Sequence, residues 1–200
     1  MVERQLRRRG ISDERVLRAM LEVPRELFVP EDLRRRAYRD GALRIGKGQT
    51  ISQPWIVACM AQLLELRGDE TVLEVGTGSG YGAAVLSRLC AEVVTIERFE
   101  SLAAGARAAL AEVGYDNVEV RVGDGARGAP DRAPFGGISV TATAIGEPPA
   151  ALFEQLGPGA ALVCPVARGR REHLIRFRDG EAEAVASVRF VPLVSGEPGE

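Results

Sequence analysis

Residues 72–82 constrain the fold of this 200-residue chain more than any other stretch. They read Val-Leu-Glu-Val-Gly-Thr-Gly-Ser-Gly-Tyr-Gly, so a short apolar run carries an acid, Glu74, and then breaks into glycine at every second position. An apolar helical pattern follows at residues 83–89. This order predicts a buried strand, a tight turn and a helix. Glycine lets such a turn approach a ligand closely, and the helix start offers free N–H groups, so the stretch predicts a nucleotide or nucleoside site.

The chain beyond residue 70 alternates between strand and helix patterns. Strands are predicted at residues 71–75, 93–96, 118–122, 137–141 and 160–166, and helices at residues 80–90, 101–113 and 149–156. Gly157, Pro158 and Gly159 predict a turn before the last of these strands. Such alternation is typical of an α/β fold with a doubly wound, mostly parallel sheet and helices on both faces. Two strand patterns at residues 174–178 and 184–192, joined at Asp179, add an antiparallel C-terminal hairpin at the sheet edge.

The first 70 residues have a different pattern. Residues 1–40 read as N-terminal helices, with Ser12 as the cap of one of them. Residues 41–53 read as a loop with small polar groups, and Pro54 then begins a clear helix. Ser52 therefore lies at the N-terminal end of that helix. It either caps the helix or presents its hydroxyl beside an anion-friendly helix end, and the spacing favours neither interpretation.

No linker is long enough to separate two domains. We expect one domain over residues 1–200, with N-terminal helices and a substrate-side loop at 1–70, a cofactor-binding α/β core at 71–166, and the hairpin and an acidic tail at 167–200.

Composition narrows the class of protein. The formal net charge of −2 gives no support for nucleic-acid binding, which usually needs a strongly basic face. No apolar run reaches membrane-spanning length, and the N-terminus has no secretory signal pattern. Cys59, Cys90 and Cys164 are widely spaced in apolar stretches and read as buried free thiols, and His173 is the single histidine, so we expect no metal site. We expect a cytoplasmic monomer.

Three acids, Glu74, Glu97 and Asp124, lie on three successive predicted strand ends, where open α/β sheets bind ligands. Glu97 suits the hydroxyls of a ribose, and Asp124 suits the exocyclic amine of adenine. Residues 78–83 also match the dinucleotide fingerprint G-x-G-x-x-A. However, Glu74 would repel a pyrophosphate and attract the ammonium of S-adenosylmethionine. Charge therefore favours S-adenosylmethionine over NAD.

Two motifs resemble a known family. Residues 74–80 look like motif I of the class I methyltransferases, and residues 48–54, Gly-Gln-Thr-Ile-Ser-Gln-Pro, resemble the signature of the protein-L-isoaspartate O-methyltransferases. The positions that are similar to that family too are 23–25, 28–30, 37–38, 40, 123–125, 140–141 and 189–193, so the resemblance covers nearly the whole chain. It implies a Rossmann-like class I methyltransferase fold.

The resemblance also implies an activity. The chain would transfer a methyl group from S-adenosylmethionine to the α-carboxylate of L-isoaspartyl residues in damaged proteins, leaving S-adenosylhomocysteine and starting repair through a succinimide. Ser52 would be the catalytic residue, holding the substrate carboxylate. The implied cofactor-binding residues are Gln49, Thr50, Ile51, Glu74, Gly76, Thr77, Gly78, Ser79, Gly80, Glu97, Arg98, Asp124, Gly125, Thr141 and Glu172.

The chain departs from the family pattern at two informative positions. Gly136 replaces a usual aspartate, and Glu172 aligns where glutamine is often found near the cofactor. Three alternatives therefore remain open: an aspartyl O-methyltransferase that tailors one dedicated peptide, a cofactor-binding relative without catalysis and, more distantly, an NAD-dependent dehydrogenase.

Overall fold

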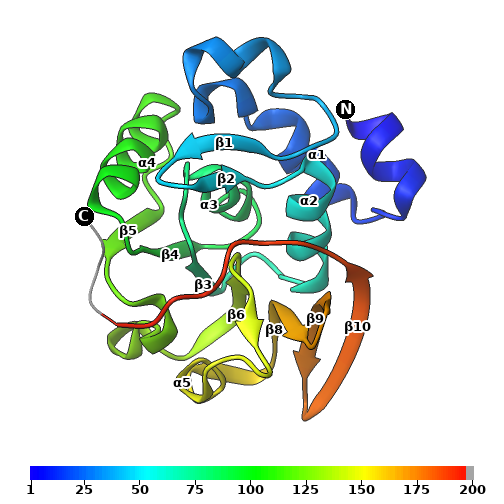
Figure 1. The fold of residues 1–200 in the computed structure, drawn as a ribbon, viewed down its shortest axis with the longest axis vertical. Coiled ribbons are helices and arrows are strands. Elements are labelled where there is room, and N and C mark those ends of the chain that lie inside the picture. Colours follow the sequence, from blue (N-terminus) through cyan, green and yellow to red (C-terminus); the bar gives the residue numbers. More distant parts are fainter. Residues whose placement is uncertain (197–200) are drawn as a thin grey trace.

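A central sheet with helices on both faces organises the molecule, and the computed structural model describes residues 1–196 of it (Figure 1). The order of the main strands is β10-β9-β8-β6-β3-β4-β5. Their bounds are β3 Thr71–Val75, β4 Glu92–Glu97, β5 Val118–Val122, β6 Phe135–Val140, β8 Leu156–Arg168, β9 Arg171–Arg178 and β10 Glu181–Ser187, and the short β7, Ala144–Ile145, pairs with β8. Strands β5, β4, β3, β6 and β8 are parallel, whereas β9 and β10 form an antiparallel hairpin at one edge. The predicted fold class is confirmed.

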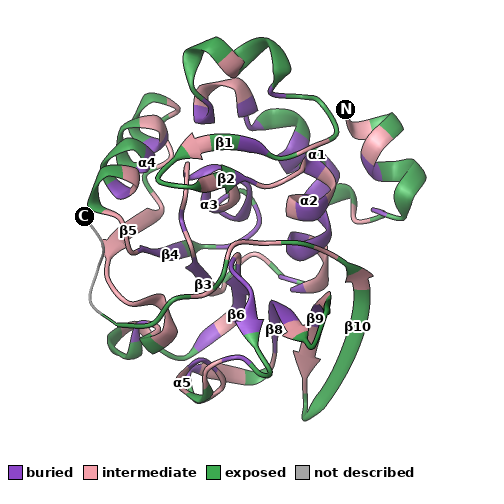
Figure 2. Cartoon of the chain, viewed as in Figure 1, coloured by how far each residue is buried: buried purple, intermediate pink, exposed green. Residues whose placement is uncertain are grey.

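The helices divide between the two faces of the sheet. Helices α1 Glu14–Glu22, α2 Pro54–Leu63, α3 Tyr81–Leu86 and α4 Glu100–Glu112 contribute to one apolar cluster, which also contains Val72 and Val93. Helix α5, Ala150–Phe153, packs in a second cluster with Leu73 and Val94. Neighbouring residues of one strand thus belong to different cores, as the two-residue period of a strand requires. Figure 2 accordingly shows β3 and β4 largely buried and β10 exposed.

The N-terminal region is helical as predicted, but most of its turns are tight. A π-helical turn, Val2–Leu6, precedes 3₁₀ turns at Arg7–Arg9, Arg25–Phe28 and Glu31–Arg36, and two further 3₁₀ turns lie at Gly125–Arg127 and Pro130–Arg132. The predicted cap of α1 was wrong by one residue. Asp13 is the cap, because its carboxylate accepts hydrogen bonds from the amides of Arg15 and Val16, 2.8 and 3.3 Å away. The Ser12 amide instead donates to Gln62.

The prediction of a loop at residues 41–53 was wrong. Strands β1, Leu43–Gly46, and β2, Gln49–Ile51, form a two-stranded antiparallel sheet of their own. Leu43 and Ile51 face each other in the register and are both buried. Gly46, Lys47 and Gly48 form the turn of this hairpin, and all three have positive φ angles.

A second correction concerns Gly157, Pro158 and Gly159, which form no separate turn but lie within β8. The pairing of β6 with β8 moves from Phe135–Leu156 to Gly137–Ala161, so β8 carries extra residues that bulge out of the register. Gly159 accommodates this bulge with a φ angle of +68°. Residue types that are typical of turns therefore form a bulge within a strand here. The predicted acidic tail at residues 195–200 lies mostly outside the described residues.

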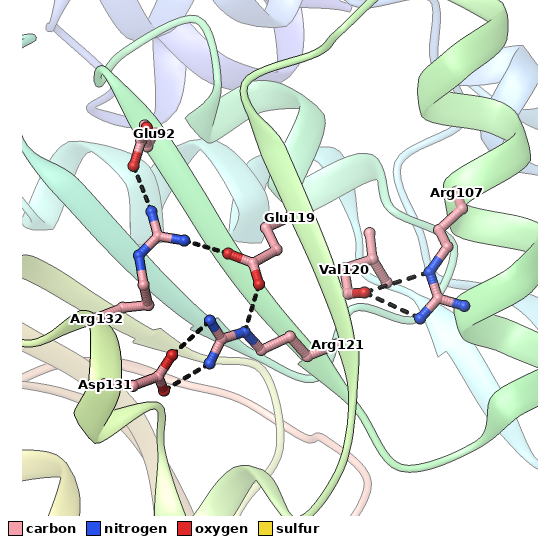
Figure 3. A network of polar contacts seen from close by, with 7 residues as sticks. All are labelled: Glu92, Arg107, Glu119, Val120, Arg121, Asp131 and Arg132. Atoms are coloured by element: carbon pink, nitrogen blue, oxygen red, sulfur yellow. Dashed lines mark hydrogen bonds and ion pairs between the residues drawn. The ribbon is translucent and has the colours of Figure 1, made fainter.

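Charged side chains cover the other edge of the sheet, at β5. Figure 3 shows Arg132 between Glu92 and Glu119, and Arg121 between Glu119 and Asp131. Such charges on an edge strand oppose pairing with another chain. No helix within residues 1–196 is long and apolar enough to cross a membrane.

Candidate active site

One cavity of about 820 Å³ opens at the carboxyl ends of β3 and β4. Most of its wall comes from four segments that are far apart in the sequence: the β1–β2 hairpin with the start of α2, the glycine turn after β3, the end of β4, and the C-terminal segment, residues 188–194. Gly125, Thr141 and Ala142 complete the wall. In Figure 1 the hairpin and the C-terminal segment flank the ends of these strands. The site is therefore built by the tertiary fold around the glycine turn.

The glycine turn needs its glycines for two different reasons. Gly76 has a φ angle of +95°, and a Cβ atom there would lie 2.3 Å from Oγ1 of Thr141. Thr141 closes this contact by donating a hydrogen bond of 2.7 Å to the Gly76 carbonyl. Gly80 instead faces away from the cavity and allows close packing on Ala106 of α4, 3.2 Å from the position of a Cβ. Gly76 thus forms part of the cavity wall, and Gly80 allows the turn to pack closely on helix α4.

Glu74 is buried beneath the glycine turn, with 1% of its surface exposed. The Thr95 hydroxyl donates a hydrogen bond of 2.7 Å to its carboxyl. The Thr77 hydroxyl in turn forms a hydrogen bond of 2.7 Å with the Thr95 hydroxyl. Burial raises the pKa of Glu74 to about 8; the Thr95 hydrogen bond opposes this shift and the nearby Glu97 adds to it. No arginine or lysine forms an ion pair with Glu74 among residues 1–196. The carboxyl therefore favours a cationic ligand group.

Glu97 holds the turn from the neighbouring strand. One of its oxygens accepts a hydrogen bond from the Gly78 amide at 2.8 Å, and the other accepts one from the Phe99 amide at 3.0 Å. Each carboxylate oxygen keeps further lone-pair capacity. Glu97 lines the cavity, so this capacity is available to ligand hydroxyls.

Ser52 lies on the opposite wall, between β2 and α2. The cap of α2 is Gln53, without a side-chain capping bond, so the interpretation of Ser52 as a helix cap was wrong. The Ser52 carbonyl accepts a hydrogen bond of 2.7 Å from the guanidinium of Arg25. This hydrogen bond from Arg25 holds the backbone of Ser52 in place, while Ser52 itself lines the cavity.

The C-terminal segment forms the last wall. The predicted second hairpin strand ends at Ser187, and residues 188–194 leave the sheet to line the cavity. Thr143 pairs with them through its amide and carbonyl, to Val191 and Leu193 at 2.8 Å each. Glu172 accepts a hydrogen bond of 3.0 Å from the Phe190 amide and a short one from Thr143. Arg98 donates to the Val194 carbonyl over 3.0 Å.

The structure brings most of the predicted site residues to this cavity. Those that line it are Gln49, Thr50, Ile51, Ser52, Glu74, Gly76, Thr77, Gly78, Ser79, Glu97, Arg98, Gly125 and Thr141. Gly80, Asp124 and Glu172 are not brought to its wall. Gly80 packs against α4 and Glu172 holds the C-terminal segment, as described above. The carboxylate of Asp124 accepts hydrogen bonds from the amides of Ala126 and Gly196, at 3.0 and 2.8 Å.

Sequence reasoning missed several contributors. Thr95 has a two-residue spacing to Glu97 and therefore shares its face of β4, which was a usable signal. The C-terminal segment was identified only through a strand pattern and the family resemblance, because its position in the cavity wall depends on contacts with Thr143. The departure at Gly136 also has a local cause: a Cβ there would lie 2.4 Å from the Glu70 side chain, at the N-terminal end of the central strand β6. Across residues 1–196, no group of three or more histidine, cysteine, aspartate or glutamate residues could hold a metal ion.

Comparisons with known proteins agree on one family. A family model described as protein-L-isoaspartate(D-aspartate) O-methyltransferase matches residues 1–198. The chain is 53% identical to a protein-L-isoaspartate O-methyltransferase of Pelotomaculum thermopropionicum, over 100% of this chain and 88% of the relative. It is 52% identical to the enzyme of the same name from Methanoculleus marisnigri, over 97% of this chain and 90% of that one.

Solved structures are similar as well. A protein-L-isoaspartate O-methyltransferase structure superimposes with a TM-score of 0.84 at 30% identity, covering 100% of this chain and 67% of the other. A putative relative from Plasmodium falciparum, solved with S-adenosyl-L-homocysteine, gives a TM-score of 0.83 at 23% identity over 95% of both chains. At that identity the second match supports the fold alone.

Proposed function

Because the chain belongs to the protein-L-isoaspartate(D-aspartate) O-methyltransferase family, we propose that it methylates the α-carboxylate of L-isoaspartyl residues in damaged proteins. The methyl donor is S-adenosylmethionine, and the resulting ester starts repair through a succinimide. One observation carries the proposal: the glycine turn and Ser52 line the same cavity, so a methyl donor held by the turn faces an acceptor held at Ser52.

The residues around the turn suit S-adenosylmethionine. Gly76 leaves no room for a side chain beside Thr141, so the ligand meets backbone there. The buried Glu74 carboxyl has a pKa raised to about 8 and no cationic partner among the described residues, which suits the ammonium of an amino-acid group. Glu97 offers acceptor capacity for ribose hydroxyls. When bound, the cofactor supplies an electrophilic methyl group on a sulfonium.

We assign Ser52 the task of holding the acceptor carboxylate, with its hydroxyl as donor. A carboxylate is ionised near neutral pH, so the reaction needs no strong general base. The work left to the protein is to orient the two reactants in line and to exclude water. Gln49, Thr50 and Ile51 on β2 and the C-terminal segment wall the space between them. This division of labour needs neither a catalytic cysteine nor a histidine.

We infer that the chain acts as one unit, because its cavity takes walls from residues 41–53, from the α/β core and from residues 188–194. We also infer a reducing, cytoplasmic setting, since Cys59, Cys90 and Cys164 are all free and buried. We further infer that the protein is a monomer and that its substrates are isoaspartyl-containing proteins.

A methylation assay on matched peptides tests the function. One peptide carries a single L-isoaspartyl residue, and its control carries normal L-aspartate in the same sequence. We expect base-labile methyl ester on the first peptide only. Cofactor binding without turnover on either peptide would contradict general repair, and it would leave the dedicated peptide-tailoring enzyme or the non-catalytic relative. Thermal protection by NAD and none by S-adenosylhomocysteine would contradict the cofactor assignment.

A further inference from the structure

Arg25 has a completely buried side chain and is the largest such residue in the described chain. Its Nε donates a hydrogen bond to the Ala37 carbonyl and its Nη2 donates one to the Ser52 carbonyl, both over 2.7 Å. The remaining nitrogen, Nη1, is buried without a hydrogen-bond partner among the described residues. Such a buried, incompletely satisfied cation is rare and needs a physical reason.

The same guanidinium also contacts the donor half of the site. Its Cζ atom lies 4.6 Å from the ring centroid of Tyr81, a cation–π distance. Tyr81 is the first residue of α3, directly behind the glycine turn, and its ring meets Phe28 edge-on at 5.7 Å. Arg25 therefore connects the loop that carries Ser52 with the helix that follows the cofactor turn.

The charge of Arg25 has no acidic counterpart. No carboxylate among residues 1–196 forms an ion pair with it. Burial lowers the pKa of its guanidinium, which the Tyr81 contact only partly opposes. An apolar side chain of similar volume would avoid this desolvation cost. The charge is useful if an anion arrives nearby, and the proposed acceptor group at Ser52 is a carboxylate.

We propose that Arg25 is a positioning residue for methyl transfer: it fixes the Ser52 backbone relative to the donor turn and supplies positive potential behind the acceptor carboxylate. It touches neither reactant and acts through Ser52. The inference rests on the proposed acceptor role of Ser52 and extends it, since it names the group that holds that residue in place.

A double-mutant cycle tests the coupling. The variants are Arg25→Met, Ser52→Ala and their combination, with Arg25→Lys as the conservative change. Arg15→Met is the matched control, because Arg15 also donates to two backbone carbonyls, those of Leu66 and Leu89 at 2.7 Å each, yet lines no part of the cavity. Each variant is measured for kcat and KM on the isoaspartyl peptide, for S-adenosylhomocysteine affinity and for Tm.

We expect Arg25→Met to lower kcat/KM by about 10- to 100-fold, mainly through KM for the peptide, while cofactor affinity changes by less than about threefold. The double variant should lose little beyond Ser52→Ala, and Arg25→Lys should recover part of the loss. Arg15→Met should lower Tm without changing kcat/KM. Additive losses in the cycle, or an Arg25→Met variant that changes only Tm, would overturn the inference.

Two further measurements keep the test decisive. If Arg25→Met does not fold, Arg25→Lys is used for the test instead. It retains the positive charge but lacks the planar guanidinium that donates to two carbonyls at once. Hydrogen exchange at the amides of residues 49–53 reports the positioning without any activity: it should accelerate in the Arg25 variants and not in Arg15→Met. Failure of the wild-type protein to methylate the peptide would contradict the proposed function, whereas unchanged exchange would contradict the role of Arg25.

Discussion

The hydroxyl of Thr95 on β4 donates a hydrogen bond to the buried carboxyl of Glu74 on β3, across 2.7 Å. The two residues are direct neighbours in the parallel register and face the same side of the sheet. A neutral hydroxyl cannot replace the hydration that burial removes from a carboxylate, and the pKa of Glu74 is raised to about 8. The site therefore holds an acid that ionises readily only when a cation joins it.

Cofactor binding should release a proton near pH 7, because the ammonium of S-adenosylmethionine lowers the raised pKa of Glu74. Affinity should rise with pH up to about pH 8 and then level off. Calorimetry in buffers of different ionisation enthalpy measures the proton released. Glu74→Gln should abolish this proton release and weaken binding by about 10- to 100-fold. Equal proton release by wild type and Glu74→Gln would contradict the assignment.

The same pKa predicts a pH dependence of stability for the ligand-free protein. The folded pKa of Glu74 lies above its usual value of 4.5, so the folded state binds the proton more tightly than the unfolded state. This contribution is fully present below about pH 4.5 and is lost as pH rises to about 8. Urea unfolding between pH 5 and pH 9 should show the decline in wild type and a smaller one in Glu74→Gln. Thr95→Val should steepen it.

Ser52→Ala should lower kcat/KM on the isoaspartyl peptide while S-adenosylhomocysteine affinity stays nearly unchanged. Loss of a hydrogen bond to a charged group corresponds to about 10- to 100-fold. Ser101→Ala on the exposed side of α4 is the control and should match wild type in both measurements. A large loss of cofactor affinity in Ser52→Ala would instead place Ser52 in the cofactor site.

Gly76→Ala should weaken cofactor binding by at least about tenfold and lower the free energy of unfolding by about 1–3 kcal/mol. Its φ angle is +95° and the new Cβ would lie 2.3 Å from Oγ1 of Thr141. Gly105→Ala is the matched control, because Gly105 lies within α4 and a Cβ there meets nothing within 4 Å. That change should stabilise the protein by about 0.5–1 kcal/mol. Similar effects of the two variants would contradict the packing explanation.

Glu172→Ala should loosen the C-terminal segment, because the Phe190 amide and the Thr143 hydroxyl lose their shared acceptor. Amide hydrogen exchange at Phe190 should accelerate, and KM for the peptide should rise. Glu172→Gln keeps a carbonyl oxygen as acceptor and should retain most of the protection. Glu183→Ala on the exposed strand β10 is the control. Unchanged exchange at Phe190 would contradict this role of Glu172. It would show that the backbone hydrogen bonds to Thr143 are enough to hold the C-terminal segment.

Arg132→Gln should lower the free energy of unfolding by about 0.5–1 kcal/mol at low salt and by less at high salt, since its partners Glu92 and Glu119 are partly exposed. Cofactor affinity should not change, because the network lies outside the cavity. Arg35→Gln serves as the control, for Arg35 makes no hydrogen bond or ion pair among residues 1–196, and it should leave stability unchanged. A loss of stability that does not depend on salt would contradict an electrostatic role and would indicate that the aliphatic part of Arg132 stabilises the fold by packing.

The local signals in the sequence were sufficient for much of the sheet. Strands β3 and β5 fall at the predicted residues, because each is rich in valine and is followed directly by a glycine, Gly76 or Gly123. The predictions were wrong where glycine was ambiguous. The β1–β2 hairpin and the bulge in β8 both use glycines to turn or kink a strand, and only pairing with a partner strand distinguishes these uses from a loop.

The sequence by itself determined the glycine turn at residues 72–82, the acids beside it and the Ser52 motif, because each depends on neighbours within a few positions along the chain. The tertiary structure decided which of these share a cavity. It brought Ser52 opposite Gly76, turned Asp124 and Glu172 toward backbone amides, and placed Arg25 behind Ser52 and Tyr81. These contacts join residues 18 to 72 positions apart in the sequence, so their geometry exists only once the core has packed.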